Sequence, residues 1–412
     1  MSSSLRKWLQ VSIFNLMLIA LIGVILRYKI AFSLPFIDQK YLLHGHSHFA
    51  FAGWITQALM ALLVAYLSEK SGENYFSKYR WLLYANLTTA YGMLLTFPLQ
   101  GYAFSSILFS TLSIFVSYVF AVSYLRDIRK IKDSNTGHGW FRVALLCNAV
   151  SSIGPFALAY MMATKNIHQN WYLASIYFFL HFQYNGWFLF ACMGLLHYQL
   201  SKYGLSSYIL SRIYILFAIA LLPAFFLSVL WWPIPSWLYV LVVIAAICQL
   251  AGWWLLIRLI QQHLAQIKKK ISQVSRYLFI LCAIAFTIKL CLQSGSVIPS
   301  LSKLAFGFRP IVIGYLHLVL LGVISLFIIS YTLTYQLISV NKPTITGFII
   351  FTAGIFITEL LLMIQGVVGL NYEGVPFIHI FLLASAIILL AGMLIVNYGQ
   401  IRYKDDRSHK IR

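Results

Sequence analysis

Acidic residues are scarce in this chain, which has only nine Asp and Glu among 412 residues, against 30 Lys and Arg. Charged residues together make up 9% of the sequence, whereas 61% of it is hydrophobic and the mean hydropathy is +0.83. A soluble protein of this length needs many more charges to cover its surface. The lack of charge therefore excludes a soluble protein, and the lack of a long polar segment excludes a separate soluble domain.

Cysteine is also sparse, and its spacing excludes common redox and zinc motifs. The five cysteines, none of them in CxxC spacing, are Cys147, Cys192, Cys248, Cys282 and Cys291. All five lie within or at the ends of apolar runs, which is typical of buried free thiols.

Apolar runs of about 20 residues, the length that crosses a bilayer as a helix, recur from end to end. The predicted fold is therefore an all-α integral membrane protein of about twelve transmembrane helices, forming one polytopic domain over residues 1–412. The predicted spans are 8–26, 42–68, 81–97, 104–125, 143–163, 171–197, 209–231, 238–257, 277–292, 311–332, 345–367 and 377–396.

The net charge of +21 reflects topology. With the N-terminus in the cytoplasm, 23 Lys and Arg lie on the inner side and seven on the outer side. This bias follows the positive-inside rule and predicts a multi-pass protein of the plasma (inner) membrane with both termini cytoplasmic. The expected partners are the lipid bilayer and other respiratory or redox membrane subunits, with no nucleic acid.

Three spans share a short histidine pattern. His48 in the second span, His181 in the sixth and His317 in the tenth are each followed five residues later by glycine. The separations of 133 and 136 residues each cover four spans, so the pattern predicts three pseudo-repeated four-helix arcs around an axis along the membrane normal. The glycine is a small residue of the kind that permits close helix approach.

A histidine inside a membrane is a functional candidate, although an interhelical hydrogen bond is an equally good account of a single one. With this topology, the three histidines lie in the outer half of the membrane, where imidazoles from different helices can ligate a metal or haem iron. His44 and His48 are four residues apart and share a helix face, whereas His46 points elsewhere.

These features resemble the catalytic subunit I of the haem-copper oxidase and nitric oxide reductase superfamily. The stretch from His46 to Trp54 looks like the HAHxxxxGW segment of short subunit-I-like membrane proteins. The segment 180–187 is similar to the copper-ligand segment of nitric oxide reductases, and 315–320 resembles the HxH segment of the tenth span. The resemblance implies one low-spin haem ligated by His48 and His317, with His44 as the alternative if the helix begins later.

The departures from that family concern copper. Tyr315 stands where the family has the high-spin haem ligand, and no histidine occurs between His197 and His263 to complete a copper site. Asn185 stands four residues after His181, where oxidases have tyrosine and the reductases have glutamate. A copper site needs at least three good ligands, so copper binding at His181 is not expected. This loss argues against oxygen reduction coupled to proton pumping.

Other polar groups extend the predicted site. Arg309, with Lys303 and Lys40, is a candidate for pairing with haem propionates or for interfacial anchoring. Lys289 is expected to snorkel outward. Glu359, the only acidic residue well inside a span, is either a neutral hydrogen-bonded group or part of a proton path.

The leading functional hypothesis is a haem-binding membrane protein in electron transfer or in handling a diatomic gas such as NO or O2. One alternative is an NnrS-like stress or metal-handling transporter, and another is a non-catalytic membrane subunit whose histidines only bridge helices. A transporter more typically has inverted repeats and broken helices, whereas this repeat keeps its orientation. Oxidoreductase ancestry follows from the resemblance alone, and enzymatic activity stays open.

Overall fold

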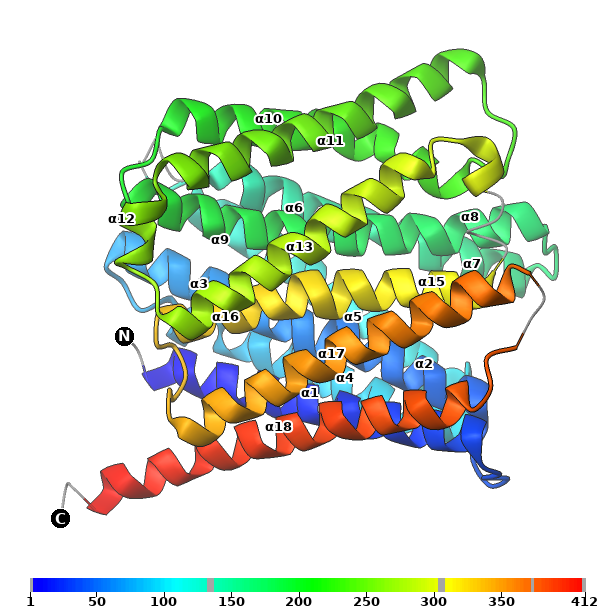
Figure 1. Ribbon diagram of the computed structural model, residues 1–412, viewed down its shortest axis with the longest axis horizontal. Helices are drawn as coiled ribbons and strands as arrows, with labels where there is room; N and C mark the ends of the chain where they lie inside the picture. Colours follow the sequence, from blue (N-terminus) through cyan, green and yellow to red (C-terminus); the bar gives the residue numbers. More distant parts are fainter. Residues whose placement is uncertain (1–2, 132–136, 303–307, 372–373, 410–412) are drawn as a thin grey trace. The chain divides into compact units, whose positions relative to one another are not determined.

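The computed structural model describes residues 3–131, 137–302, 308–371 and 374–409, with the backbone alone from residue 402 onward. The described residues are helical, with no strand among them (Figure 1). In chain order the α-helices are α1 Ser3–Ala31, α2 Gln39–Phe49, α3 Gln57–Ser71, α4 Tyr75–Gln100, α5 Phe104–Ile128, α6 His138–Ser151, α7 Ile153–Ala163, α8 Gln169–Leu180, α9 Leu189–Lys202, α10 Ser207–Ala224, α11 Ser236–Gln262, α12 Leu264–Lys268, α13 Gln273–Gly295, α15 Arg309–His317, α16 Leu326–Thr334, α17 Lys342–Gly369 and α18 Ile378–His409.

Each predicted span coincides with one helix or with two or three helical segments joined end to end. Ten of these helical stretches are long and apolar enough to cross a membrane, which confirms a multi-pass membrane protein. The other two predicted spans, 81–97 and 171–197, lie in α4 and in the continuous helix 169–202, and as spans they stay predictions. The second of these stretches carries the polar residues His181, Gln183 and Asn185, which lower its hydropathy.

The chain divides into two compact units, residues 1–120 with 325–412 and residues 121–324. In the first unit, α17 lies along α18, and α18 packs along α1 (Figure 1). Small residues permit this approach, because a Cβ added to Gly392 would lie 2.8 Å from the carbonyl oxygen of Gly347. Thr358 of α17 also hydrogen-bonds Ser385 of α18, with 3.0 Å between the hydroxyl oxygens.

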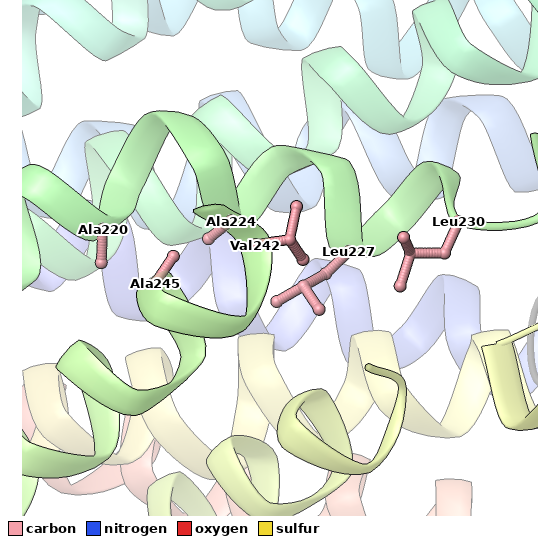
Figure 2. Packing of buried hydrophobic residues seen from close by; sticks show 6 residues of the cluster. All are labelled: Ala220, Ala224, Leu227, Leu230, Val242 and Ala245. Atoms are coloured by element: carbon pink, nitrogen blue, oxygen red, sulfur yellow. The ribbon is translucent and has the colours of Figure 1, made fainter. Parts of the chain in front are cut away.

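In the second unit, α10 packs against α11 through small and branched apolar residues. Figure 2 shows this cluster of Ala220, Ala224, Leu227, Leu230, Val242 and Ala245. The α-helix α10 ends one residue after Pro223, and the chain continues as a 3-10 turn, η3, over Phe225–Val229. Proline has no backbone N–H and disfavours a continuing α-helix, so the change of helix type occurs here.

Three helical stretches contain an interior π-helical segment, and these segments fall on the predicted repeat. They are η1 Ala50–Thr56, η2 His181–Phe188 and η4 Leu318–Ser325, each inside an unbroken helix. Each begins at the aligned histidine or within two residues of it, and each contains the glycine of the repeat pattern. Because π-helical turns are rare in proteins, this coincidence supports a threefold repeat at the level of local structure.

Contacts from the preceding membrane helix follow the same repeat. Asn15 of α1 donates to the Gly53 carbonyl (2.6 Å), Gln183 donates to Asn148 of α6 (3.0 Å), and Cys282 of α13 donates to the Val323 carbonyl (3.3 Å). The contacting residues on the preceding helices are Asn15, Asn148 and Cys282, which are separated by 133 and 134 residues. Each π segment is therefore contacted by a polar or thiol group at an equivalent position. The arrangement of the three arcs around one axis stays a prediction.

Burial changes along each of these three helices at the aligned histidine. In the tenth predicted span, eight of nine residues of α16 are buried, whereas no residue of α15 is. The second and sixth predicted spans show the same contrast, with α3 and α9 mostly buried and α2 and α8 mostly not. In each of these helices the half after the histidine is packed and the half before it is not, so each candidate histidine lies where the packing begins.

Candidate functional site

Three histidines are presented by α2, which begins after Asp38. The Asp38 carboxylate accepts a hydrogen bond from the backbone N–H of Tyr41 (2.8 Å) and caps the helix. His44, His46 and His48 follow along the next turns, and all three side chains are half-buried. The π segment η1 begins two residues after His48.

His44 and His48 lie on one face of α2, as their four-residue spacing predicted. The ring of His48 stacks on Phe97 of α4, with 4.5 Å between ring centroids and 15° between ring planes. The His44 ring meets Tyr102 edge-on at 4.7 Å, and Nε2 of His48 lies 3.3 Å from the Tyr102 hydroxyl. His44, His48 and Tyr102 therefore form one cluster. Nothing in the sequence indicated that Tyr102 belongs to it.

His46 lies on another face of α2 and is directed at α1. Its ring hydrogen-bonds the backbone of Ile19, and its Cε1 lies 3.7 Å from the position of a Cβ added to Gly23. Arg27, one helical turn beyond Gly23, is within electrostatic reach of the ring. Nδ1 of His46 is buried and has no hydrogen-bond partner among the described residues.

His181 bridges two helices of the second unit. Its Nε2 lies 2.9 Å from the Leu221 carbonyl, and its Nδ1 lies 3.2 Å from the side-chain nitrogen of Asn185. A carbonyl only accepts, so Nε2 carries the proton, and Nδ1 accepts from Asn185. Both ring nitrogens are therefore occupied by protein groups, and neither is free for a metal.

The Leu221 carbonyl accepts from His181 because of the change in helix type after Pro223. The backbone N–H of Phe225 would bond Leu221 in a continuing α-helix, but it bonds Leu222 and Pro223 instead. This local shift leaves the carbonyl without its α-helical donor, and the buried imidazole supplies one.

Tyr315 occupies the position where the resembled family has its high-spin haem ligand. Its ring meets Tyr184 of the sixth predicted span edge-on, with 6.2 Å between centroids, and the two hydroxyl groups are hydrogen-bonded. The Tyr184 hydroxyl also hydrogen-bonds Ser228. Tyr315 thus faces the sixth predicted span, which carries the aligned histidine of the second repeat.

The remaining predicted site residues are His317, Arg309, Lys40 and Lys303. His317 ends α15, belongs to the second unit and is half-buried. Arg309 begins α15 and is exposed, Lys40 is exposed in the first turn of α2, and Lys303 lies outside the described residues. His317 and Arg309 belong to the second unit and Lys40 to the first, so their joint role at a haem stays a prediction.

The sequence analysis assigned roles to two charged residues inside predicted spans, Lys289 and Glu359. Lys289 was expected to snorkel outward, and this prediction is wrong, because its side chain is 1% exposed and its Nζ lies 5.5 Å from the centre of the Phe286 ring. Glu359 of α17 is half-buried, and its Oε1 accepts no hydrogen bond from the described residues. Neither assigned role of Glu359 is decided by this placement.

Among the described residues, no group of three or more His, Cys, Asp or Glu side chains converges as a metal site. The chain matches no protein-family model, and no curated protein matches it significantly.

Proposed function

We propose that this protein binds one low-spin haem within the membrane and serves in electron transfer or in handling a diatomic gas, as a divergent relative of the haem-copper oxidase and nitric oxide reductase catalytic subunits. The observation that carries the proposal is the set of π-helical segments at the three aligned histidines, His48, His181 and His317. Interior π-helical turns are frequent at functional sites, where they change which side chains face a ligand.

The candidate haem ligands differ in what their side chains contact. In the first two repeats the aligned histidine faces the next helix of its own repeat, since His48 contacts α4 and His181 contacts α10. Tyr315, two residues before His317, contacts Tyr184 of the second repeat, whereas His46, two residues before His48, is directed at α1 of its own repeat. We propose that His317 and His46 are the two histidines that hold the haem.

The family resemblance implied His48 and His317 as the pair, and we propose His46 in the place of His48 on the following contacts. Nε2 of His48 already lies against the Tyr102 hydroxyl, whereas Nδ1 of His46 is a buried nitrogen without a described partner. The unpacked N-terminal halves of α2 and α15 are consistent with a ligand beside them. Two imidazoles would hold the iron six-coordinate and low-spin. Arg27 would supply positive charge for a propionate.

The sixth span supports a haem protein without a copper centre. Of the histidines that bind copper in the resembled family, this chain retains only His181. Its two ring nitrogens bond Leu221 and Asn185. Buried side chains, including Tyr184, occupy the surrounding region. Within the proposal, the protein lies in the plasma membrane with both termini cytoplasmic and exchanges electrons with other redox membrane subunits.

Optical spectroscopy of the purified protein tests the proposal. The reduced-minus-oxidised spectrum should show the bands of a low-spin haem, which His317→Ala and His46→Ala should remove or convert to high-spin. His48→Ala is the matched control on the same helix and should keep the low-spin spectrum. A wild-type protein without haem, purified from cells with ample haem supply, would disprove the function. Loss of the spectrum in His48→Ala but not in His46→Ala would disprove the ligand assignment.

A further inference from the structure

A second group of ligand-forming side chains lies on the face of α2 opposite to the proposed haem ligand. It consists of His44, His48 and Tyr102, and we call it the Tyr102 cluster. The two histidines are four residues apart on one helix, and both rings contact the tyrosine. Nε2 of His44 is buried and has no hydrogen-bond partner among the described residues. A buried polar atom without a partner is costly and calls for a missing ligand or water.

The distance within the cluster is suited to a metal ion. Nε2 of His48 and the Tyr102 hydroxyl oxygen are 3.3 Å apart, which is long for a hydrogen bond to a hydroxyl group. Two ligands bound at ~2.0–2.1 Å to one tetrahedral ion lie about 3.3 Å apart. Histidines at i and i+4 are a common pair of metal ligands, because both project from one face of the helix.

We propose that the Tyr102 cluster binds a divalent first-row transition metal through the two imidazoles and the phenolate oxygen, with water completing the coordination. Imidazole ligands select Zn(II), Cu(II) and Ni(II) over Mg(II) and Ca(II), and Cu(II) binds most tightly in the general order of affinities. The site does not depend on the haem, since His46 faces α1 and contributes nothing to the cluster.

Local structure holds the three ligands in place. Phe97 stacks on His48 and also meets Tyr102 edge-on at 5.0 Å, so both ligand rings pack against one aromatic side chain. Gly101 has a φ of 62°, and a Cβ there would lie 2.3 Å from the Tyr41 ring. Glycine is therefore required for the turn that positions Tyr102. The Tyr102 side chain is 49% exposed, which gives a metal ion a path from the surface.

Cu(II) binding to the purified, haem-loaded, full-length protein tests the proposal. Added as the chloride, one equivalent of Cu(II) should bind and give an electron paramagnetic resonance spectrum with hyperfine coupling to two nitrogens. A phenolate-to-copper absorption band should accompany it. His44→Ala and His48→Ala should each weaken binding by ~10–100-fold. Tyr102→Phe should remove the band, and His263→Ala, a substitution outside the cluster, should leave binding unchanged.

Equal Cu(II) affinity of the wild type and the His44→Ala/His48→Ala double variant would overturn the proposal. If that variant does not fold, Tyr102→Phe decides, because its half-exposed ring remains and only the hydroxyl group is lost. Unchanged affinity together with an unchanged spectrum in Tyr102→Phe would then overturn it. Haem content measured on the same samples separates the two proposals, since loss of the metal site should leave the haem spectrum intact.

Discussion

Asn15 on α1 donates a hydrogen bond to the carbonyl of Gly53, 2.6 Å away inside the π segment η1. The amide oxygen of Asn15 accepts in turn from the Tyr91 hydroxyl (2.7 Å), and Asn86 of α4 donates to the neighbouring Ala52 carbonyl (3.0 Å). A π-helical turn shifts the backbone ladder and requires other donors for the carbonyl groups that it leaves aside. In this membrane helix, asparagines from the two adjacent helices provide them.

Asn15→Ala should therefore destabilise the first unit. The variant leaves the Gly53 carbonyl buried without its side-chain donor, a loss of ~1–3 kcal/mol in unfolding free energy. Tyr91→Phe removes only the contact to the other end of the same amide and should cost less. Thermal unfolding of the detergent-purified variants measures both effects. Equal stability of Asn15→Ala and the wild type would contradict the role given to this hydrogen bond.

The repeat glycines should differ in their tolerance of alanine. A Cβ on Gly186 would lie 2.5 Å from Cβ of Cys147, whereas a Cβ on Gly322 would lie 3.2 Å from that of Ala285. Gly186→Ala should therefore be destabilising by ~1–3 kcal/mol through overpacking, and Gly322→Ala by less.

The control for Gly186→Ala is a second substitution at the contact. Cys147→Ala keeps the clashing Cβ and should not restore stability, whereas Cys147→Gly removes it and should restore part of the loss. Thermal unfolding of the single and double variants measures this difference. Rescue by Cys147→Ala equal to that by Cys147→Gly would show that the Sγ atom, and not the close backbone approach, sets the cost.

The sequence predicted the helical membrane fold because apolar length and charge placement determine it directly. The repeated histidine–glycine pattern was also visible in the sequence, because His48, His181 and His317 are each followed by glycine at one spacing. The π segments were not predicted, since they are rare, short insertions within apolar helices that continue on either side. Their side-chain partners, Asn15 and Cys282, belong to other helices and are visible only in the folded chain.

The sequence predicted which residues share a face only within a single helix. The spacing of His44 and His48 placed them on one face, but no pattern within α2 indicates which neighbouring helix that face meets. The contacts of His48 with Phe97 of α4 and with Tyr102 were therefore not predicted. Burial of Lys289 was missed for a similar reason, because snorkelling was inferred from depth alone and depth does not reveal packing.

His181→Ala should lower stability without changing metal or haem content. The substitution removes the donor to the Leu221 carbonyl and leaves that carbonyl and the Asn185 amide unpaired, at a cost of ~1–3 kcal/mol. Asn185→Leu should have a smaller effect, since the bond to Leu221 remains. Metal analysis after mild chelation and thermal unfolding provide the two readouts. One equivalent of copper that is present in the wild type and lost in His181→Ala would contradict the bridging role.

Reporter fusions should place both termini and the loop 261–276 on the cytoplasmic side. The expectation follows from the division of Lys and Arg, 23 on one side and seven on the other. A fusion to the loop 164–170 should give the opposite signal and serves as the control. An outward-facing C-terminus with an inward-facing N-terminus would require an odd number of spans and would contradict the predicted twelve.

Carbon monoxide should bind the reduced wild-type protein weakly, because two imidazoles leave the iron no open position. His46→Gly should open one position and make the haem bind carbon monoxide readily, with the spectral shift of a five-coordinate iron taking a sixth ligand. Free imidazole should enter the cavity left by the missing side chain, restore the low-spin spectrum and compete with carbon monoxide. His48→Gly, which alters the other face of α2, should do none of this. Because imidazole rescue requires a folded pocket with its iron in place, it separates loss of a ligand from general unfolding. If His48→Gly shows the rescue and His46→Gly does not, His48 is the iron ligand, and the buried Nδ1 of His46 does not mark the haem site.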